Sequence, residues 1–241
     1  MNEDQRGEVH RIRQAYAERS LTGRGKLYHW SRADVHLNVW GRDHAIAMLL
    51  AADGWDDLAD RQILDVGCGY GAWLRRLADW GADPACLHGV DLVEERIGHA
   101  RRLSPAGVDL RVDSGYGLPY GDASMDLVAA QTVFSSILDE ARRRELAAEM
   151  RRVTRPGGRA LIYDFRYDNP RNPDVRALRA SSLRQLFPGW RLRRRSLTLL
   201  PPLARRLAGR APALAVLLER GLPPLRSHLL ALLHRPEVGD A

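Results

Sequence analysis

The sequence has 241 residues, of which 45% are hydrophobic and 28% charged, a composition typical of a globular protein with a sizeable core. No apolar run reaches the roughly 20 residues that a membrane-spanning helix needs, and the first residues lack the apolar segment of a signal peptide. Two cysteines do not make a disulfide framework, and no histidine or cysteine cluster has metal-ligand spacing. We therefore expect a soluble, cytoplasmic protein without a metal site.

The net charge of +7 is distributed unevenly along the chain. Residues 151–241 hold 19 arginines against 6 acidic residues, whereas residues 1–150 hold 18 basic and 24 acidic residues. A basic surface can bind nucleic acid. However, Lys26 is the only lysine, and so strong a preference for arginine is more easily explained by codon usage than by phosphate recognition. Nucleic acid is therefore not the expected partner.

Residues 1–58 are predicted to form a helical region that precedes the core. Helical spacing of hydrophobic residues predicts a helix from Gln5 to Arg19 and a second from Arg42 to Ala52. The stretch between them is rich in aromatic and histidine residues. Its tryptophans, Trp30 and Trp40, fit either a cover over a ligand or anchors in the core.

The most informative segment runs from Ile63 to Gly71. A buried-strand pattern ends there in three glycines at alternate positions, and a helical pattern at residues 73–78 follows at once. Glycine permits positive φ and lets a ligand approach the backbone, and the turn brings a helix N-terminus to the same place. Strand, glycine turn and helix predict the first half of a nucleoside-binding βαβ unit.

Two ligand classes compete for this turn. Residues 67–72 satisfy the G-x-G-x-x-G/A pattern of NAD and flavin sites. Asp65 argues against a pyrophosphate, which it would repel, and favours a ligand carrying an ammonium and a sulfonium. The order D-x-G-x-G-x-G resembles motif I of class I S-adenosylmethionine-dependent methyltransferases. The resemblance implies that five residues border the cofactor S-adenosylmethionine: Asp65, Gly67, Cys68, Gly69 and Gly71.

The next predicted strand, Leu87–Asp91, ends in a carboxylate 24 residues after Gly67. A carboxylate at this position can accept hydrogen bonds from the hydroxyls of a ribose. Asp91 can equally cap the helix that follows, and both roles are compatible. Leu92 would then offer an apolar face to the adenine.

The third predicted strand, residues 110–114, ends in a polar pair. The resemblance assigns Asp113 to the exocyclic amine of adenine and the Ser114 backbone to a ring nitrogen, and a solvated turn is the alternative. Residues 118–128 are similar to the L-P-F-x-D-x-S-F-D-x-V signature of the small-molecule group that includes the quinone C-methyltransferases. Gln131, at the end of the fourth strand, is expected to flank the methionine part of the cofactor.

The resemblance covers about residues 60–166 and ends with Met150–Gly158, which is similar to the R-V-L-K-P-G-G helix end before a fifth strand, residues 160–165. It implies an α/β, Rossmann-like class I methyltransferase fold. That fold has a seven-stranded, mostly parallel sheet with an antiparallel last strand and helices on both faces. Residues 59–241 would form this core, and residues 1–58 resemble the lid that closes over cofactor and acceptor.

A polar loop follows the fifth strand, where open α/β sheets bind ligands. We predict substrate contacts for three of its residues: Arg166, Asn169 and Asn172. Asp174 is predicted to cap a helix that runs to about Phe187.

Residues 187–225 are predicted to form a basic crossover over one face of the sheet. Residues 190–199 and 226–234 suit strands, and two short apolar pieces, 203–207 and 213–222, lie between them. The proline, leucine and arginine mixture at 201–224 is also compatible with an amphipathic element on a membrane surface, which is not the expected role.

The resemblance implies methyl transfer to a small-molecule acceptor, with oxygen as the expected acceptor atom, in a bacterial biosynthetic pathway. An oxygen acceptor needs a base, and His29, among the aromatic residues of the lid, is the candidate. The fourth strand lacks the N/D-P-P-Y/F signature of enzymes that methylate base amines. The alternatives are an RNA methyltransferase using the basic C-terminal face and a non-catalytic S-adenosylmethionine-binding partner subunit. The oligomeric state is not predicted.

Overall fold

The computed structural model describes residues 3–21, 29, 31–169, 172–237 and 239. Trp30, one of the two tryptophans predicted either to cover a ligand or to anchor the core, lies outside these residues. Within them, no helix combines the length and apolar character needed to cross a bilayer, and no three His, Cys, Asp or Glu side chains are grouped so that they could hold a metal ion.

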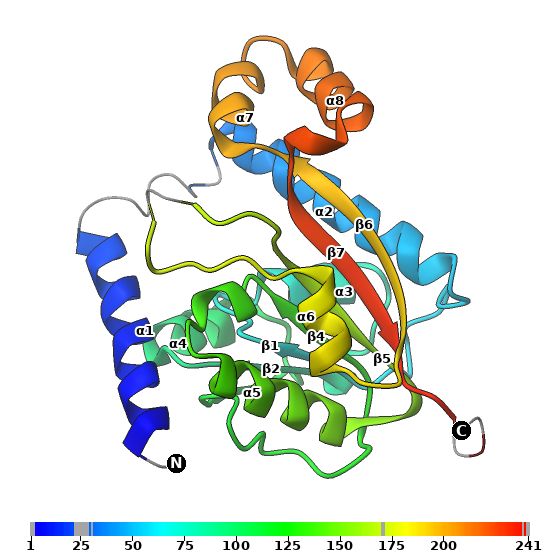
Figure 1. Cartoon of the computed structure of the whole chain (residues 1–241). Coiled ribbons are helices and arrows are strands. Elements are labelled where there is room, and N and C mark those ends of the chain that lie inside the picture. The colour runs from blue at the N-terminus through cyan, green and yellow to red at the C-terminus, as the bar shows by residue number, and fades with distance from the viewer. Residues whose placement is uncertain (1–2, 22–28, 30, 170–171, 238, 240–241) are drawn as a thin grey trace.

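One seven-stranded sheet in the order β3-β2-β1-β4-β5-β7-β6 organises the described chain (Figure 1). Its strands are β1 (Ile63–Val66), β2 (Leu87–Asp91), β3 (Asp109–Val112), β4 (Met125–Gln131), β5 (Thr154–Phe165), β6 (Arg191–Leu199) and β7 (Arg226–His234). The first five pair in parallel, and β7 lies antiparallel between β5 and β6. The predicted mostly parallel sheet with an antiparallel last strand is therefore confirmed.

Helices cover both faces of the sheet, as predicted. The α-helices are α1 (Glu3–Leu21), α2 (Ala33–Ala51), α3 (Ala72–Asp79), α4 (Glu94–Leu103), α5 (Glu140–Val153), α6 (Ala180–Leu186), α7 (Pro201–Leu207) and α8 (Pro212–Gly221). Short 3₁₀ turns occupy η2 (Pro84–Cys86), η3 (Phe134–Ser136) and η4 (Pro223–Leu225).

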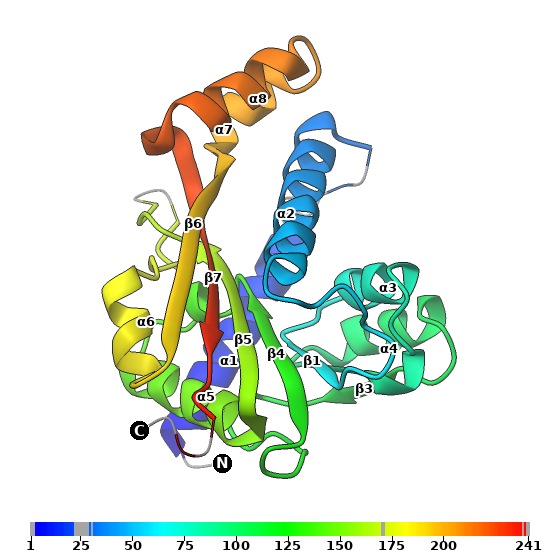
Figure 2. The ribbon, with the colours of Figure 1, turned by 90° about the vertical axis from the view of Figure 1, so that its right-hand side faces the viewer.

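The central strands are apolar because both of their faces are buried. Successive side chains of a strand point to opposite faces, so Ile63 packs with α2, α3 and α4, whereas Leu64 packs with α5 and α6. Figure 2 shows these two helical layers on either side of the sheet. The alternation also places Asp65 on the same face as Ile63, towards α2.

Two helices begin elsewhere than predicted. Helix α2 starts at Ala33, nine residues before the predicted Arg42, and therefore includes most of the stretch rich in aromatic residues. Helix α6 starts at Ala180 instead of next to Asp174. The preceding residues are held extended, because Ala177 N donates to the Asp168 carboxylate and Leu178 N donates to the carbonyl of Phe165.

The connection from β6 to β7 differs from the predicted crossover over a face of the sheet. Helices α7 and α8 lie beyond the ends of β6 and β7, at one end of the molecule (Figures 1 and 2). Their buried residues, Ala204 and Ala215, form a small separate cluster with Leu199. Leu37 of α2 packs against this cluster, so the N-terminal half of α2 supports the pair of helices.

Candidate functional site

The glycine turn follows β1 and is held against the end of β2. The backbone N–H groups of Gly67 and Cys68 both donate to the carbonyl of Val90, at 2.8 and 2.9 Å. Gly67 has a φ of +72°, and a Cβ there would lie 2.5 Å from Cγ2 of Val133. Glycine is thus required at this position both by the backbone conformation and by the close approach of the chain after β4.

Gly69 occupies the middle of the turn, and its surroundings differ from those of Gly67. Its φ is +55°, and among the described atoms none lies within 4 Å of the position that a Cβ would take. At Gly71 a Cβ would instead lie 3.2 Å from Ala100 of α4, which explains a glycine where α3 begins. Among the three glycines of the turn, Gly69 is therefore the one with open space in the direction of a Cβ. Cys68, between Gly67 and Gly69, is buried, and burial raises the pKa of its thiol.

Asp91, at the carboxyl end of β2, joins the turn to α4. Its Oδ2 accepts the N–H of Gly69 at 2.9 Å, and its Oδ1 accepts the N–H of Val93 at 2.8 Å. Asp91 therefore shapes the turn before α4 but does not cap the helix, because α4 begins at Glu94 with Val93 as its N-cap and has no side-chain capping hydrogen bond. A carboxylate has about four lone-pair sites, so each oxygen retains one for a further donor. The ribose contact stays a prediction, as does the packing of the half-buried Leu92 against adenine.

Asp65 and Gln131 lie on the same face of neighbouring strands, near their carboxyl ends. In the described structure Asp65 Oδ1 and both polar atoms of the Gln131 amide are buried without a hydrogen-bond partner. Burial raises the pKa of Asp65 to about 8, against a smaller opposing effect of the Arg42 charge. Buried polar groups are normally paired. These three atoms fit a ligand with an ammonium for Asp65 and both donor and acceptor groups for the amide of Gln131.

The turn after Gln131 is strained. Thr132 has a φ of +56°, which is uncommon for a residue with a branched side chain. Its N–H donates to the Tyr163 carbonyl at 2.6 Å, and its hydroxyl donates to the Gln131 carbonyl at 2.7 Å. Such strain persists where the surrounding structure imposes it, often at functional sites. No sequence pattern indicated this conformation.

Arg42 of α2 is a charged residue near the site, and the sequence did not indicate its position there. Its charge acts on the carboxyl of Asp65, and its guanidinium lies 5.9 Å from the centre of the Tyr163 ring. It donates two hydrogen bonds to Oδ1 of Asp43, its neighbour in the helix. The sequence showed Arg42 only as the first residue of a predicted helix.

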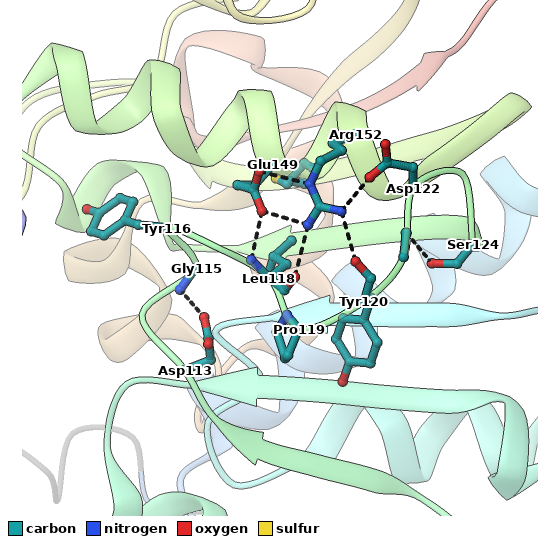
Figure 3. A network of polar contacts seen from close by, with 12 residues as sticks. Asp113, Gly115, Tyr116, Leu118, Pro119, Tyr120, Asp122, Ser124, Glu149 and Arg152 are labelled. Atoms are coloured by element: carbon teal, nitrogen blue, oxygen red, sulfur yellow. Dashed lines mark hydrogen bonds and ion pairs between the residues drawn. The ribbon is translucent and has the colours of Figure 1, made fainter. Parts of the chain in front are cut away.

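Asp113 and Ser114 directly follow β3 and begin the segment between β3 and β4, and Figure 3 shows Asp113 in this segment. Asp113 Oδ1 accepts the N–H of Gly115 at 2.7 Å, and burial raises the pKa of Asp113. Ser114 Oγ accepts the N–H of Tyr116 at 3.4 Å. Both side chains therefore shape a turn at the carboxyl edge of the sheet, and the predicted adenine contacts are not tested.

The segment that continues from this turn is fixed by one ion pair of α5, which Figure 3 shows. Arg152 donates to the carbonyls of Leu118 and Tyr120 at 2.9 and 2.8 Å. It also pairs with Glu149, whose Oε2 accepts the N–H of Leu118 at 2.7 Å. The L-P-Y-G-D-A-S-M-D-L-V signature thus includes the segment that Arg152 and Glu149 hold in place.

Helix α1 reaches residues that follow the carboxyl ends of β2 and β4. Arg13 donates to the carbonyl of Leu92 at 3.2 Å, and the guanidinium of Arg96 lies 3.9 Å from the centre of the Tyr16 ring. Nearer the N-terminus of α1, Glu8 accepts the N–H of Leu138 at 2.9 Å. These contacts place α1 next to the predicted adenine-contacting residue. The lid role and the boundary at residue 58 stay predictions.

An open hollow of about 480 Å³ lies beyond the carboxyl end of β5. It is lined by Leu138, Asp168, Asn169, Asn172, Pro173, Val175 and Arg176. Two of the three predicted substrate-contacting residues, Asn169 and Asn172, are therefore brought together. Arg166 is not part of the lining. Its Nη1 donates to the carbonyl of Pro223 at 3.3 Å, which ties the start of the loop to the helical connection before β7.

His29 lies on an exposed turn before α2, where its Nδ1 is 2.8 Å from Oγ of Ser31. Its predicted role as a base is not tested by these contacts. His228 is deeply buried, stacked on Tyr163 with 4.6 Å between ring centres, and hydrogen-bonded to Ser227 Oγ at 2.8 Å. Burial lowers the pKa of His228 to about 3, so this imidazole is neutral at physiological pH.

The wall of the hollow depends on Arg143, a buried residue of α5. Arg143 donates to the carbonyls of Ile137, Arg176 and Ala177, at 2.7, 2.9 and 3.5 Å. Replacing it with methionine should leave these carbonyls without their donor and lower the free energy of unfolding by about 3 kcal/mol. Denaturant unfolding measures this change.

Arg144 provides the matched control, since it is the exposed neighbour of Arg143 on the same helix. Arg144→Met should change the free energy of unfolding by no more than about 0.5 kcal/mol. Equal losses in the two variants would mean that the three carbonyl contacts do not stabilise the loop.

Comparison with known proteins gives one family match. Residues 63–158 match the family model of a methyltransferase domain. A dimethylglycine N-methyltransferase from Parasynechococcus marenigrum is 33% identical over 150 residues, which are 56% of this chain and 51% of that protein. A 2-methyl-6-phytyl-1,4-hydroquinone methyltransferase from Synechocystis is 30% identical over 131 residues, 53% of this chain and 39% of that protein. The chain thus spans about half or less of the length of these two relatives.

Among solved structures, the chain is similar to magnesium protoporphyrin IX methyltransferase from Synechocystis, which was solved with bound S-adenosylmethionine. The TM-score is 0.64 at 15% identity, and the match covers 94% of this chain and 96% of that one. This likeness concerns the fold.

Proposed function

We propose that the protein is a class I S-adenosylmethionine-dependent methyltransferase that transfers a methyl group from this cofactor to a small-molecule acceptor, since residues 63–158 match the family model of a methyltransferase domain. We further propose oxygen as the acceptor atom and a bacterial biosynthetic pathway as the setting. The observation that carries the proposal is the set of buried, unpartnered polar atoms of Asp65 and Gln131 beside an open glycine turn. A zwitterionic amino acid moiety satisfies these atoms, because its ammonium favours ionised Asp65, whereas the pyrophosphate of NAD offers no cation to that carboxyl.

The residues of the site divide the cofactor between them. Asp65 and Gln131 would hold the methionine part, Asp91 the ribose hydroxyls, and Leu92 and Asp113 the adenine, with the Ser114 backbone on a ring nitrogen. The bound cofactor supplies a methyl carbon on a sulfonium, which departs as a neutral thioether. The protein's task is to hold an acceptor atom in line with that carbon and to exclude water, and such positioning can be worth effective molarities of about 10⁵ M or more.

The acceptor is proposed to lie on the β5 side of the site, where Asn169 and Asn172 line the hollow. Two amide side chains offer donors and acceptors to the hydroxyl groups of a small molecule. Helix α1 would close the site from the β2 side as a lid. The proposed base remains His29, on the turn before α2.

The decisive experiment is calorimetric titration of the purified protein with S-adenosylmethionine, S-adenosylhomocysteine and NAD. Micromolar binding of the first two and none of NAD supports the proposal. NAD binding, or no binding of any of the three, would contradict it. Incubation with cell extracts and S-adenosylmethionine carrying a labelled methyl group then identifies the acceptor as the compound that becomes labelled. If no compound becomes labelled, the non-catalytic binding subunit is favoured. Transfer of the labelled methyl group to RNA, together with retention of the protein on RNA that falls steeply with salt, favours the RNA methyltransferase.

Binding of the cofactor should release a proton at pH 7. The raised pKa of Asp65, about 8, means that the free protein holds this carboxyl mostly protonated at pH 7. A ligand ammonium favours the carboxylate, so the pKa falls on binding and the proton leaves. Calorimetry in buffers of different ionisation enthalpy measures this release. Asp65→Asn, which cannot titrate, should release none, and equal release in the two proteins would contradict the assignment.

A further inference from the structure

We propose that α7 and α8 form a docking surface for an anionic lipid membrane. The two helices project from one end of the molecule, away from the sheet (Figures 1 and 2). All of residues 201–225 are described, and they hold seven leucines and four arginines with Glu219 as their single acidic residue. A helical segment that combines exposed leucine with arginine matches the composition of elements that lie in a membrane interface.

The apolar part of this surface is exposed on and directly after α8. Leu214 is 44% exposed and Leu217 66%, and they lie three residues apart, on one side of the helix. Leu222, directly after α8, is 47% exposed. Clustered exposed leucines are unusual on a soluble surface and mark contacts with a partner or a membrane.

The charged part of the surface has one sign. Arg205, Arg206, Arg210 and Arg220 are all exposed. Glu219, in contrast, points inwards, because its Oε1 accepts the N–H of Thr198 at 2.9 Å. The helices therefore present positive charge without an exposed acid of their own, which is complementary to an anionic headgroup layer.

The same composition disfavours RNA as the occupant. Binding of single-stranded nucleic acid combines basic residues with aromatic side chains on which bases stack. Residues 201–225 contain no aromatic residue, and leucine occupies the exposed positions instead. The structure thus favours a lipid surface over a nucleic acid for this part of the basic C-terminal third.

Docking in this way would bring the acceptor side of the molecule close to the lipid. Arg166 and Tyr167, which follow β5, contact the carbonyls of Pro223 and Pro224, at 3.3 and 3.5 Å. An acceptor with a lipid tail is then the substrate class that fits. This extension rests on the proposed function, whereas the docking itself does not.

The test is co-sedimentation of the full chain with vesicles of phosphatidylcholine and phosphatidylserine, or of phosphatidylcholine alone, without cofactor. The protein should bind the anionic vesicles only. Arg205→Gln with Arg206→Gln should weaken binding about 25-fold, since each arginine near an anionic surface contributes about fivefold. Leu214→Ser with Leu217→Ser should weaken it at least about tenfold.

Two controls distinguish binding through α7 and α8 from a general effect of net charge or of exposed apolar surface. Arg144→Gln removes an exposed arginine from α5, and Leu103→Ser removes a leucine of α4 that is 53% exposed. Both should bind like the unaltered protein. Absence of binding to anionic vesicles, or unchanged binding of the leucine variants, overturns the proposal, as does retention on polyuridylate RNA without vesicle binding. Cofactor binding, measured separately on the same variants, should be unchanged and tests the proposed function independently.

Discussion

Gly69→Val should abolish measurable binding of S-adenosylmethionine, with an affinity loss of about 100-fold or more, while the protein stays folded. The side chain would enter the open side of the glycine turn, where no described atom lies within 4 Å of the new Cβ. The cost to folding is limited to the left-handed backbone at a φ of +55°, about 1–2 kcal/mol. Calorimetric titration gives the affinity, and denaturant unfolding gives the stability.

Gly54 is the matched control for this substitution. It follows α2, has a φ of +78°, and likewise has no described atom within 4 Å of the position that a Cβ would take. Gly54→Val therefore carries the same backbone strain away from the turn and should bind the cofactor normally. Normal binding by a folded Gly69→Val protein would show that the cofactor does not occupy this side of the turn.

The core of the sheet was predictable because its signals are local. Buried apolar residues predominate in β1, β2 and β4, and a glycine or a polar residue lies at or directly after the carboxyl end of each strand. Parallel strands bring these ends to one edge, so Asp65, Asp91 and Gln131 were expected to lie near one another. The parallel register of β1 with β2 and with β4 places the carboxyl ends of the three strands side by side.

The boundaries of α2 and α6 could not be predicted, for two different reasons. Arg32, which precedes α2, makes no side-chain capping hydrogen bond, so the usual start signal is missing from the sequence. Before α6, two contacts hold the chain extended. Arg143 of α5, distant in sequence, donates to the carbonyl of Arg176, and Asp168, which precedes the predicted helix, accepts the N–H of Ala177. Local propensity was overridden there by tertiary hydrogen bonds.

Other features of the site depend on contacts between distant segments. The Tyr16 ring meets Arg96, and the charge of Arg42 acts on Asp65, across separations that no periodicity reveals. The unpartnered amide of Gln131 is likewise a property of packing, since the sequence shows a glutamine but not its neighbours. The contact of Gln131 with the methionine part of the cofactor stays a prediction, and the structure shows that its polar atoms are buried.

Asp91→Ala should weaken binding of S-adenosylmethionine by about 1.5–3 kcal/mol, the range for hydrogen bonds to a charged group. This corresponds to a loss of about 10- to 150-fold in affinity. The carboxylate is proposed to accept the ribose hydroxyls, and it also holds Gly69 N at 2.9 Å, so its removal loosens the turn as well. Calorimetric titration of the variant with S-adenosylmethionine measures the loss.

Asp83→Ala distinguishes this effect from the loss of a local hydrogen bond to the following backbone. Asp83 Oδ1 accepts the N–H of Ala85 at 2.9 Å, two residues on, just as Asp91 Oδ1 accepts that of Val93. Asp83 lies before β2, at the opposite end of the strand from Asp91. Asp83→Ala should therefore lose a comparable local hydrogen bond and keep its cofactor affinity. An equal loss in the two variants would assign the effect to the fold, and an unchanged affinity of folded Asp91→Ala would remove Asp91 from the ribose site.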